Sequence, residues 1–219
     1  MLEFNITGEV GGLRIKAEGS VKGGQCLAVT GPSGCGKTSL LRMLAGLTRP
    51  SSGHISLASN DAWFDSETGT EVRTEDRGIG FVFQDLNLFP RMTVRGNLRA
   101  APERSADLLE AVGLSGRADD RPASLSGGEA QRAAIARALA QMPDVLLLDE
   151  PFAALDDQTA AECIRLVRLQ ATANAIPTVM VAHDFKTAEA MGCESALRLS
   201  TDGVATLVPL AAAFTASEH

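Results

Sequence analysis

Aromatic side chains are scarce in this 219-residue sequence, which has no Tyr, one Trp and eight Phe, together 4% of the chain. Basic residues are in deficit as well, with 20 Lys and Arg against 27 Asp and Glu, giving a net charge of −7 at pH 7. Because nucleic-acid phosphates require a basic surface, this balance argues against nucleic acid as a partner. The hydrophobic share of 45% is ordinary for a globular protein, which excludes a disordered or collagen-like chain.

Long apolar runs and metal-binding cysteine patterns are absent too. No stretch approaches the roughly 18–20 apolar residues that span a bilayer, and Glu3 with no basic start ahead of an apolar run predicts no signal peptide. The four cysteines have no metal-ligand spacing, and a reducing compartment fits them best. We interpret Cys26, Cys163 and Cys193 as small buried core residues.

Hydrophobic periodicity predicts alternating strands and helices. Alternation at 2–6 and 13–18 is typical of half-buried antiparallel strands. Further strands are predicted at 26–30, 54–58, 78–83, 145–148 and 177–182, with edge strands at 196–199 and 204–208, and helices at 38–47, 157–172 and 185–191. Residues 85 to 143 read as helix and loop. The pattern predicts an α/β fold with a mixed sheet, an N-terminal antiparallel β subdomain and an inserted helical subdomain at about 85–143, within a single domain over 1–219.

A phosphate-binding loop lies between the strand at 26–30 and the helix that follows it. The eight residues G-P-S-G-C-G-K-T match the pattern G-x-x-x-x-G-K followed by Ser or Thr, in the strand-loop-helix context that the pattern requires. Its glycines let backbone N–H groups turn toward phosphate oxygens, and the helix N-terminus favours an anion. The predicted nucleotide-binding residues are Gly31, Pro32, Ser33, Gly34, Cys35, Gly36, Lys37, Thr38 and Ser39. Lys37 would reach the β- and γ-phosphates and Thr38 would bind Mg²⁺.

Two carboxylates follow the buried strand at 145–148. Asp149 and Glu150 stand where ligands bind in open α/β sheets, at the carboxyl end of a strand. After a complete phosphate loop, we interpret Asp149 as the Mg²⁺-binding residue and Glu150 as the general base that polarises the attacking water.

A second anion-binding turn, L-S-G-G-E, precedes a helical stretch with Gln131, Arg132 and Arg137. One nucleotide does not need two such turns in one subunit. With the phosphate loop and the acidic pair, this order of motifs resembles the ATP-binding-cassette (ABC) ATPase family over essentially the whole chain. In that family the turn is the signature, which contacts the γ-phosphate held by the opposite subunit; here it contains Ser126, Gly127, Gly128 and Glu129.

The resemblance assigns roles to further residues. Gln84 resembles the Q-loop glutamine, which senses Mg²⁺ and the attacking water, so catalysis is expected from Glu150, His183, Gln84 and Lys37. His183 resembles the switch histidine that touches the γ-phosphate, and Asp156 belongs to a stretch similar to the D-loop. The expected cofactors are ATP and Mg²⁺, the metal being held by Thr38, Gln84 and Asp149.

The resemblance also implies partners and a location. Two copies would sandwich two ATP molecules, and the segments F-V-F-Q-D-L-N-L-F-P and M-T-V-R-G-N are similar to the permease-docking region of importers. The chain is thus expected at the cytoplasmic face of the plasma membrane, attached through integral-membrane permease subunits, and indirectly served by an extracytoplasmic solute-binding protein. Molybdate-type importers are the best match; thiamine-type and other small-solute importers or exporters are alternatives.

Some residues depart from the family pattern. Glu129 stands where Gln is more usual, and Ala130 replaces a polar or basic residue. No aromatic residue lies between Phe4 and the phosphate loop to stack on adenine, so selectivity for ATP over GTP is expected to be weak. Within the loop, Cys35 is either a redox-sensitive thiol or simply a small residue that fits a tight turn. A C-terminal regulatory domain is expected to be absent, because the cassette uses nearly all 219 residues.

Overall fold

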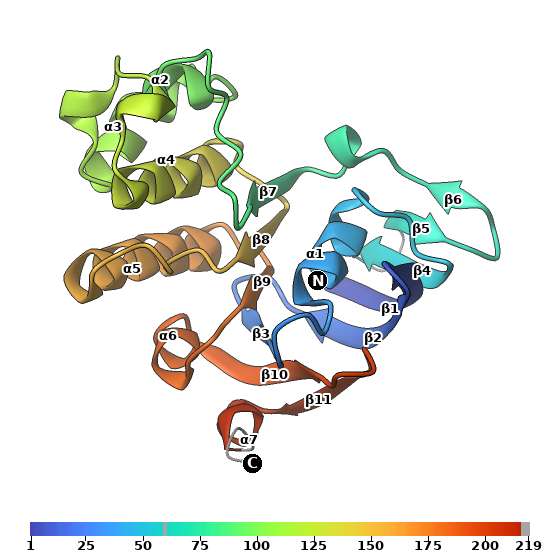
Figure 1. Ribbon diagram of the computed structural model, residues 1–219. Helices are drawn as coiled ribbons and strands as arrows, with labels where there is room; N and C mark the ends of the chain where they lie inside the picture. The colour runs from blue at the N-terminus through green and yellow to red at the C-terminus, as the bar shows by residue number, and fades with distance from the viewer. Residues whose placement is uncertain (59–60, 216–219) are drawn as a thin grey trace.

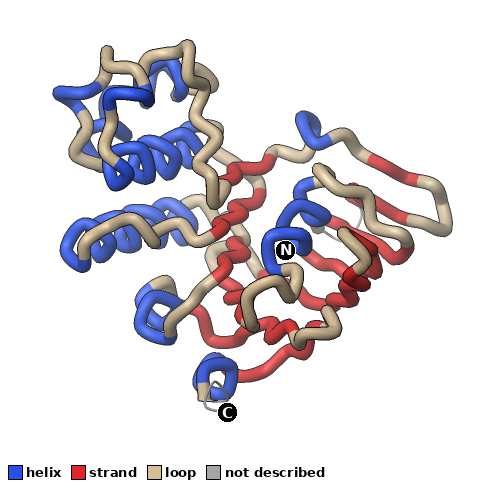
Figure 2. Tube along the Cα trace, viewed as in Figure 1, coloured by secondary structure: helices blue, strands red, loops and turns tan. Residues whose placement is uncertain are grey.

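Two β-sheets and a lobe of helices make up the computed structural model, which describes residues 1–58 and 61–215 (Figure 1). Residues 59–60 and 216–219 lie outside the described part. Most helices gather on one side of the molecule, and the strands run through its centre and the opposite side (Figure 2).

The first sheet is antiparallel and begins with a long hairpin. Its strand order is β2-β1-β4-β5-β6. The bounds are β1 Leu2–Val10, β2 Leu13–Val21, β4 Ser52–Leu57, β5 Asp61–Asp65 and β6 Thr70–Glu71. The hairpin closes at Gly11 and Gly12, whose φ of 58° and 83° cost glycine little. The prediction missed β5 and β6, because five and two residues are too few for alternation to register.

The second sheet is mixed, with the order β11-β10-β3-β9-β8-β7. Its strands are β3 Cys26–Thr30, β7 Ile79–Val82, β8 Val145–Asp149, β9 Thr178–Val181, β10 Cys193–Leu199 and β11 Ala205–Pro209. The prediction of an edge strand at 196–199 was wrong. β10 pairs with both β3 and β11, and begins three residues earlier, so only β11 of this pair is an edge.

The helices pack in separate places (Figure 1). Between the two sheets lies α1 (Lys37–Ala45), while α5 (Asp157–Ala173), α6 (Phe185–Ala190) and α7 (Leu210–Phe214) cover the other face of the mixed sheet. Between β7 and β8 come α2 (Val94–Asn97), α3 (Ser105–Ala111) and α4 (Gly127–Ala140), with short 3-10 turns, as the inserted helical lobe. The predicted fold class, including both subdomains, is therefore confirmed. In the described residues, no helix is long and apolar enough to cross a membrane.

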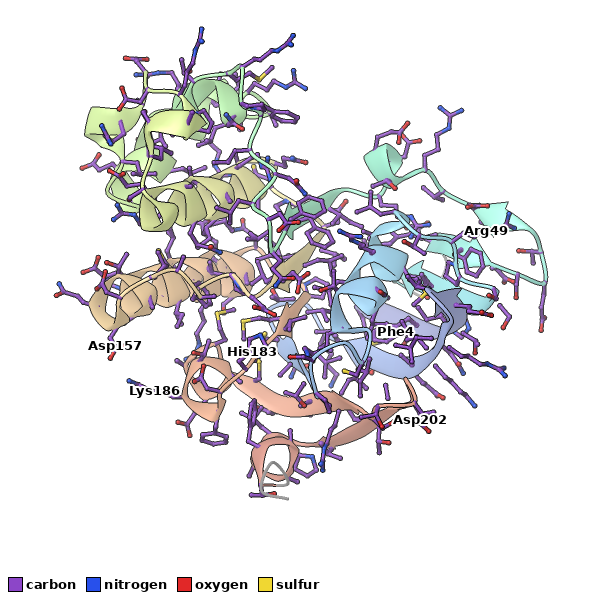
Figure 3. All side chains as sticks on the ribbon, viewed as in Figure 1. Phe4, Arg49, Asp157, His183, Lys186 and Asp202 are labelled. Atoms are coloured by element: carbon purple, nitrogen blue, oxygen red, sulfur yellow. The ribbon has the colours of Figure 1, made fainter. Side chains whose placement is uncertain are left out.

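The mixed sheet has a hydrophobic core on each of its two faces. One core joins the sheet to α4, α5 and the rest of the helical side, with many alanines from α4. The other surrounds α1 between the two sheets and includes Phe4, which is labelled in Figure 3, together with Leu40, Trp63 and Val179. Burial on both faces explains why β3, β8 and β9 are continuous apolar runs.

A buried arginine ties the antiparallel sheet to α1. Arg77 is 2% exposed and donates hydrogen bonds to the main-chain oxygens of Leu44 (2.9 Å), Val72 (3.0 Å) and Trp63 (3.3 Å). Its guanidinium also lies 5.8 Å from the Trp63 ring centroid. Burial lowers the pKa of Arg77. Three carbonyls and one ring thus take the place of the water that the cation gave up.

We predict that Arg77→Ala strongly destabilises the protein, because it removes the hydrogen bonds that tie α1 to the antiparallel sheet. Of the three oxygens, that of Trp63 keeps a backbone donor, Val72 N at 2.8 Å. Urea unfolding should show a loss of about 3 kcal/mol. Arg49→Ala is the matched control: Arg49 forms an exposed ion pair with Glu71 at 3.3 Å, and its removal should cost less than about 1 kcal/mol. Equal losses for the two variants would contradict the assigned role of Arg77.

Candidate functional site

Four parallel strands end at one edge of the mixed sheet, and the predicted catalytic groups stand on that edge. The registers pair Val29 with Val181, Asp149 with Val181, and Val82 with Leu148. Each strand therefore ends at the same level. The phosphate loop follows β3, His183 follows β9, Glu150 follows β8 and Gln84 follows β7. The carboxyl ends of parallel strands are the usual ligand-binding edge of such sheets.

The phosphate loop forms the turn between β3 and the N-terminus of α1. Gly31, Gly34 and Gly36 have φ of 139°, 80° and 98°, which side chains rarely adopt. A Cβ on Gly31 would lie 2.3 Å from the oxygen of Leu199, so glycine is required there. The other predicted residues of this loop lie on the same turn or on the first residues of α1: Pro32, Ser33, Cys35, Lys37, Thr38 and Ser39.

Lys37 is folded back into the loop. Its Nζ donates to the main-chain oxygens of Gly31 at 2.9 Å and Pro32 at 2.8 Å, and the residue is 7% exposed. Backbone N–H groups, a helix N-terminus and this cation together make a site for a polyanion. Cys35 is 2% exposed beside Gly31, which favours the interpretation as a small residue that fits the turn.

Asp149 is a buried carboxylate with an unused oxygen. It is 1% exposed, and its Oδ1 has no hydrogen-bond partner among the residues that the structure describes. Burial raises the pKa of Asp149, while a hydrogen bond from Thr38 and the charges of Arg42 and Lys37 oppose the rise. A carboxylate next to a hydroxyl, with an orphaned buried oxygen, fits an oxygen-seeking cation such as Mg²⁺.

Glu150 and His183 are in direct contact. Glu150 Oε1 lies 2.6 Å from His183 Nε2, and the two side chains are 20% and 53% exposed. His183 stands in the middle of the molecule, where β9 gives way to α6 (Figure 3). Glu150 has a φ of 52°, so its backbone lies in the left-handed region that non-glycine residues rarely occupy. Such strain at a carboxylate beside a histidine is typical of functional sites.

Gln131 supports this strained segment, a role that the sequence prediction missed. It is 4% exposed and donates to the oxygen of Pro151 at 2.6 Å, and to that of Glu150 at 3.5 Å. The sequence signal that could have indicated this role was a polar residue, Gln131, within the Ala-rich segment that forms α4.

The signature turn stands apart from these groups, at the N-terminus of α4. A Cβ on Gly128 would lie 3.3 Å from the oxygen of Ala154, so the turn packs on the segment before α5. Ser126 caps α4: its Oγ accepts from Glu129 N at 3.3 Å, and its own N–H donates to Glu129 Oε2. Gly127 is the first residue of the helix. The hydroxyl of Ser126 keeps its hydrogen available for a ligand.

Glu129 forms an ion pair with Arg117 of the same chain. Arg117 Nε lies 3.0 Å from Glu129 Oε1, and the same guanidinium pairs with Asp120 at 2.8 Å. The Arg117 hydrogen bond, with those of Ser126, lowers the pKa of Glu129 to about 2. The glutamate is therefore ionised, and its charge is matched within the same subunit.

Asp156 caps α5. Its Oδ1 accepts from Thr159 N at 3.0 Å, its Oδ2 accepts from the Thr159 hydroxyl, and these bonds lower the pKa of Asp156. The carboxylate thus fixes the start of α5, next to the residues on which Gly128 packs.

A mixed sheet that presents these groups along its carboxyl edge defines the class of P-loop nucleoside triphosphatases. The family model for ABC transporters matches residues 16–153. The chain belongs to the ABC transporter family of ATPases.

Related proteins of known name agree with this family. The chain is 39% identical over 210 residues to the "Probable sulfate/thiosulfate import ATP-binding protein CysA" of Chlorella vulgaris, covering 91% of this chain and 84% of that protein. It is 41% identical over 192 residues to the molybdenum import ATP-binding protein ModC of Paramagnetospirillum magneticum, covering 84% of this chain but 52% of that protein. The chain therefore spans about half the length of that relative.

A solved structure matches the fold almost end to end. It is a dimeric, post-hydrolysis state of an ATP-binding cassette bound to ADP and Pi, 30% identical, with a TM-score of 0.79. The match covers 96% of this chain and 99% of that one.

We predict that Asp149→Asn stabilises the nucleotide-free protein at pH 7. The pKa of Asp149 is raised in the folded protein, so the folded state holds this proton more tightly than the unfolded state does. Ionisation of Asp149 therefore lowers the stability once the pH exceeds the ordinary pKa of an aspartate. Urea midpoints should be higher than wild type at pH 7, and the gap should shrink below about pH 4.

Asp156→Asn is the control with the opposite sign, because a lowered folded-state pKa contributes stability above the ordinary value. It should lower the midpoint at pH 7. A less stable Asp149→Asn protein at that pH would contradict the prediction.

Proposed function

We propose that this chain is the ATP-hydrolysing subunit of an ABC importer that works as a homodimer with Mg²⁺ and a membrane permease. The observation that carries the proposal is the shared strand edge. There the phosphate loop, Glu150, His183 and Gln84 follow four adjacent strands that end at one level, with Asp149 as the last residue of β8. A nucleotide-binding module without catalysis would have no use for a glutamate in contact with a histidine.

Each group has a chemical task at this edge. The loop N–H groups and Lys37 bind the phosphates, and Mg²⁺, when bound, neutralises phosphate charge. Thr38 and Asp149 would hold the metal, with Gln84 completing the set. Glu150 accepts the proton of the attacking water. His183 orients Glu150 through the 2.6 Å contact.

A second copy of the chain would complete each site. The signature turn lies on the helical lobe against Ala154, and its Ser126 hydroxyl and the N-terminus of α4 are groups that bind anions. In a head-to-tail dimer each signature turn contacts the γ-phosphate bound by the other subunit. The dimeric cassette of known structure supports this arrangement. Hydrolysis removes the shared phosphate, and the dimer opens.

Aliphatic side chains, with no aromatic ring among them, pack on the phosphate loop at Gly36. A Cβ on Gly36 would lie 2.6 Å from Ile15 Cδ1 and 3.2 Å from Leu13 Cδ2, so the second hairpin strand packs directly on the phosphate loop. Neither residue can stack on a purine as an aromatic ring does. We therefore propose weak discrimination between ATP and GTP.

A groove beside Gln84 is the proposed permease-docking site. It has a volume of about 320 Å³ and is lined by three phenylalanine rings together with aliphatic and polar side chains: Ala45, Leu47, Thr74, Ile79, Phe81, Phe83, Asn87, Phe89, Arg137 and Gln141. Phe89 is 44% exposed, yet its backbone is held by the buried side chain of Asn97, which accepts from Phe89 N at 2.7 Å. A fixed, exposed ring in an apolar groove suits an anchor for a partner helix.

The solute is proposed from the relatives alone, whose names give sulfate or thiosulfate and molybdenum import. The solutes in these names share the form of a tetrahedral oxyanion, of which molybdate is one, and we propose a solute of this class. A thiamine-type importer or an exporter is the alternative, which transport assays with the permease decide. In either case the chain would lie at the cytoplasmic face of the plasma membrane, and an importer would also take solute from an extracytoplasmic binding protein.

We predict that Glu150→Gln keeps ATP binding but lowers turnover roughly 10²- to 10⁴-fold, because the general base is lost. Size-exclusion chromatography should then show an ATP-dependent dimer that wild type does not accumulate. Lys37→Ala is the comparison variant, since it should lose triphosphate affinity and with it the dimer. Wild-type hydrolysis by Glu150→Gln would disprove the role of Glu150.

We also predict that Phe89→Ala weakens permease binding roughly 10- to 100-fold, the loss expected for one buried aromatic anchor. The measurement is a titration against the detergent-solubilised permease. Phe185→Ala is the matched control, because Phe185 is 38% exposed on α6, on another surface. A permease affinity equal to wild type for Phe89→Ala would place docking elsewhere.

A further inference from the structure

A buried arginine of the signature helix holds the turn that carries Gln84. Arg137 lies on α4, is 8% exposed, and donates through Nη2 to the oxygen of Leu86 at 2.8 Å and through Nη1 to the oxygen of Asn87. Its Cζ lies 5.7 Å from the Phe89 ring centroid. Two carbonyls and a ring are its contacts in the described chain, with no carboxylate among them, and burial lowers the pKa of Arg137.

The turn itself needs such support. Leu86 and Asn87 have φ of 59° and 45°, so two successive residues occupy the left-handed region. This is unfavourable for side chains with a Cβ, especially for Leu. Inside the turn, Leu86 N donates to the oxygen of Phe83 at 2.9 Å, and Gln84 lies between these two residues. The Arg137 guanidinium thus bonds the carbonyls of Leu86 and Asn87, two and three residues after Gln84.

The same helix carries the signature turn at its other end. α4 runs without a break over Gly127–Ala140, with Ser126 as its cap. Arg137 lies eleven residues beyond Ser126, about 16 Å along the helix axis. A single helix therefore joins the signature turn to the turn of Gln84.

We propose that Arg137 is a positioning residue that makes Gln84 of one ATP site move with the signature turn that serves the other site. This inference rests on the proposed function, in which the signature contacts the partner's nucleotide. Engagement of the signature by that nucleotide then shifts Gln84 in its own site. The two sites of the dimer hydrolyse ATP cooperatively as a result.

The experiment compares Arg137→Lys with wild type in the isolated protein of residues 1–219. Lysine keeps the charge but cannot bond both carbonyls as a fork does. We expect turnover to fall about tenfold and the Hill coefficient for ATP to fall to one, while ATP affinity measured on the monomer is unchanged. The same substitution in a Gln84→Ala background should lower turnover less than twofold, because Arg137 acts through Gln84.

Arg104→Lys is the matched control, because Arg104 lies in the 3-10 helix Pro102–Arg104 and bonds α4 from outside it. Arg104 donates to the oxygen of Leu139 at 3.4 Å and to Gln170 Oε1 at 3.2 Å, away from the turn of Gln84. It should leave the Hill coefficient at the wild-type value even if thermal unfolding shifts. Leu86→Gly supplies a second background, because glycine adopts the φ of 59° without strain and the turn then keeps its shape with less help from Arg137. In Leu86→Gly/Arg137→Lys, turnover should partly recover while the Hill coefficient stays at one, because the link to α4 is still missing.

Two results would overturn the proposal. One is an equal fall in turnover for Arg137→Lys with and without Gln84, which a merely structural role would produce. The other is a wild-type Hill coefficient in Leu86→Gly/Arg137→Lys, the variant that also serves if Arg137→Lys alone does not fold, because glycine removes the strain of the turn. A wild-type protein that fails to hydrolyse ATP would instead refute the proposed function itself.

Discussion

The parallel register of β3, β9, β8 and β7 is the constraint on which the rest of the structure depends. Residues that lie far apart in the chain reach one line only because each strand ends at the level of its neighbour. A shift of one residue in β8 would move Asp149 and Glu150 along the edge and turn their side chains to the opposite face. Continuous apolar runs buried on both faces of the sheet hold that register.

The buried charged side chains have two kinds of surroundings. One kind stabilises the fold, and the other belongs to the candidate site. Arg77 and Arg137 lie among main-chain oxygens, which satisfy the cation permanently and join distant segments. Asp149 has one oxygen without a hydrogen-bond partner in the described part of the chain, and burial raises the pKa of this carboxyl. The first arrangement stabilises the fold, whereas the second holds a carboxylate ready for a cation at a cost to stability, as functional sites commonly do.

The features that could be predicted from the sequence are those that depend on the spacing of neighbouring residues. The phosphate loop requires glycine at 31, 34 and 36 because their φ values are positive, and the central strands are unbroken apolar runs. Missed features depend on partners far along the chain. Arg77 reaches Leu44 across 33 residues, Arg137 reaches Leu86 across 51, and β10 becomes an inner strand only when β11 pairs beside it. No window of neighbouring residues contains that information.

Lys37 gives the phosphate loop internal hydrogen bonds of its own. Because its ammonium group already bonds the oxygens of Gly31 and Pro32, the loop does not depend on a ligand to stay folded. An arriving triphosphate therefore meets a preorganised cradle, and little chain entropy is lost on binding. It must, however, compete with two internal carbonyls for the same ammonium. Affinity is then the result of an exchange of partners, which favours rapid release once the terminal phosphate has gone.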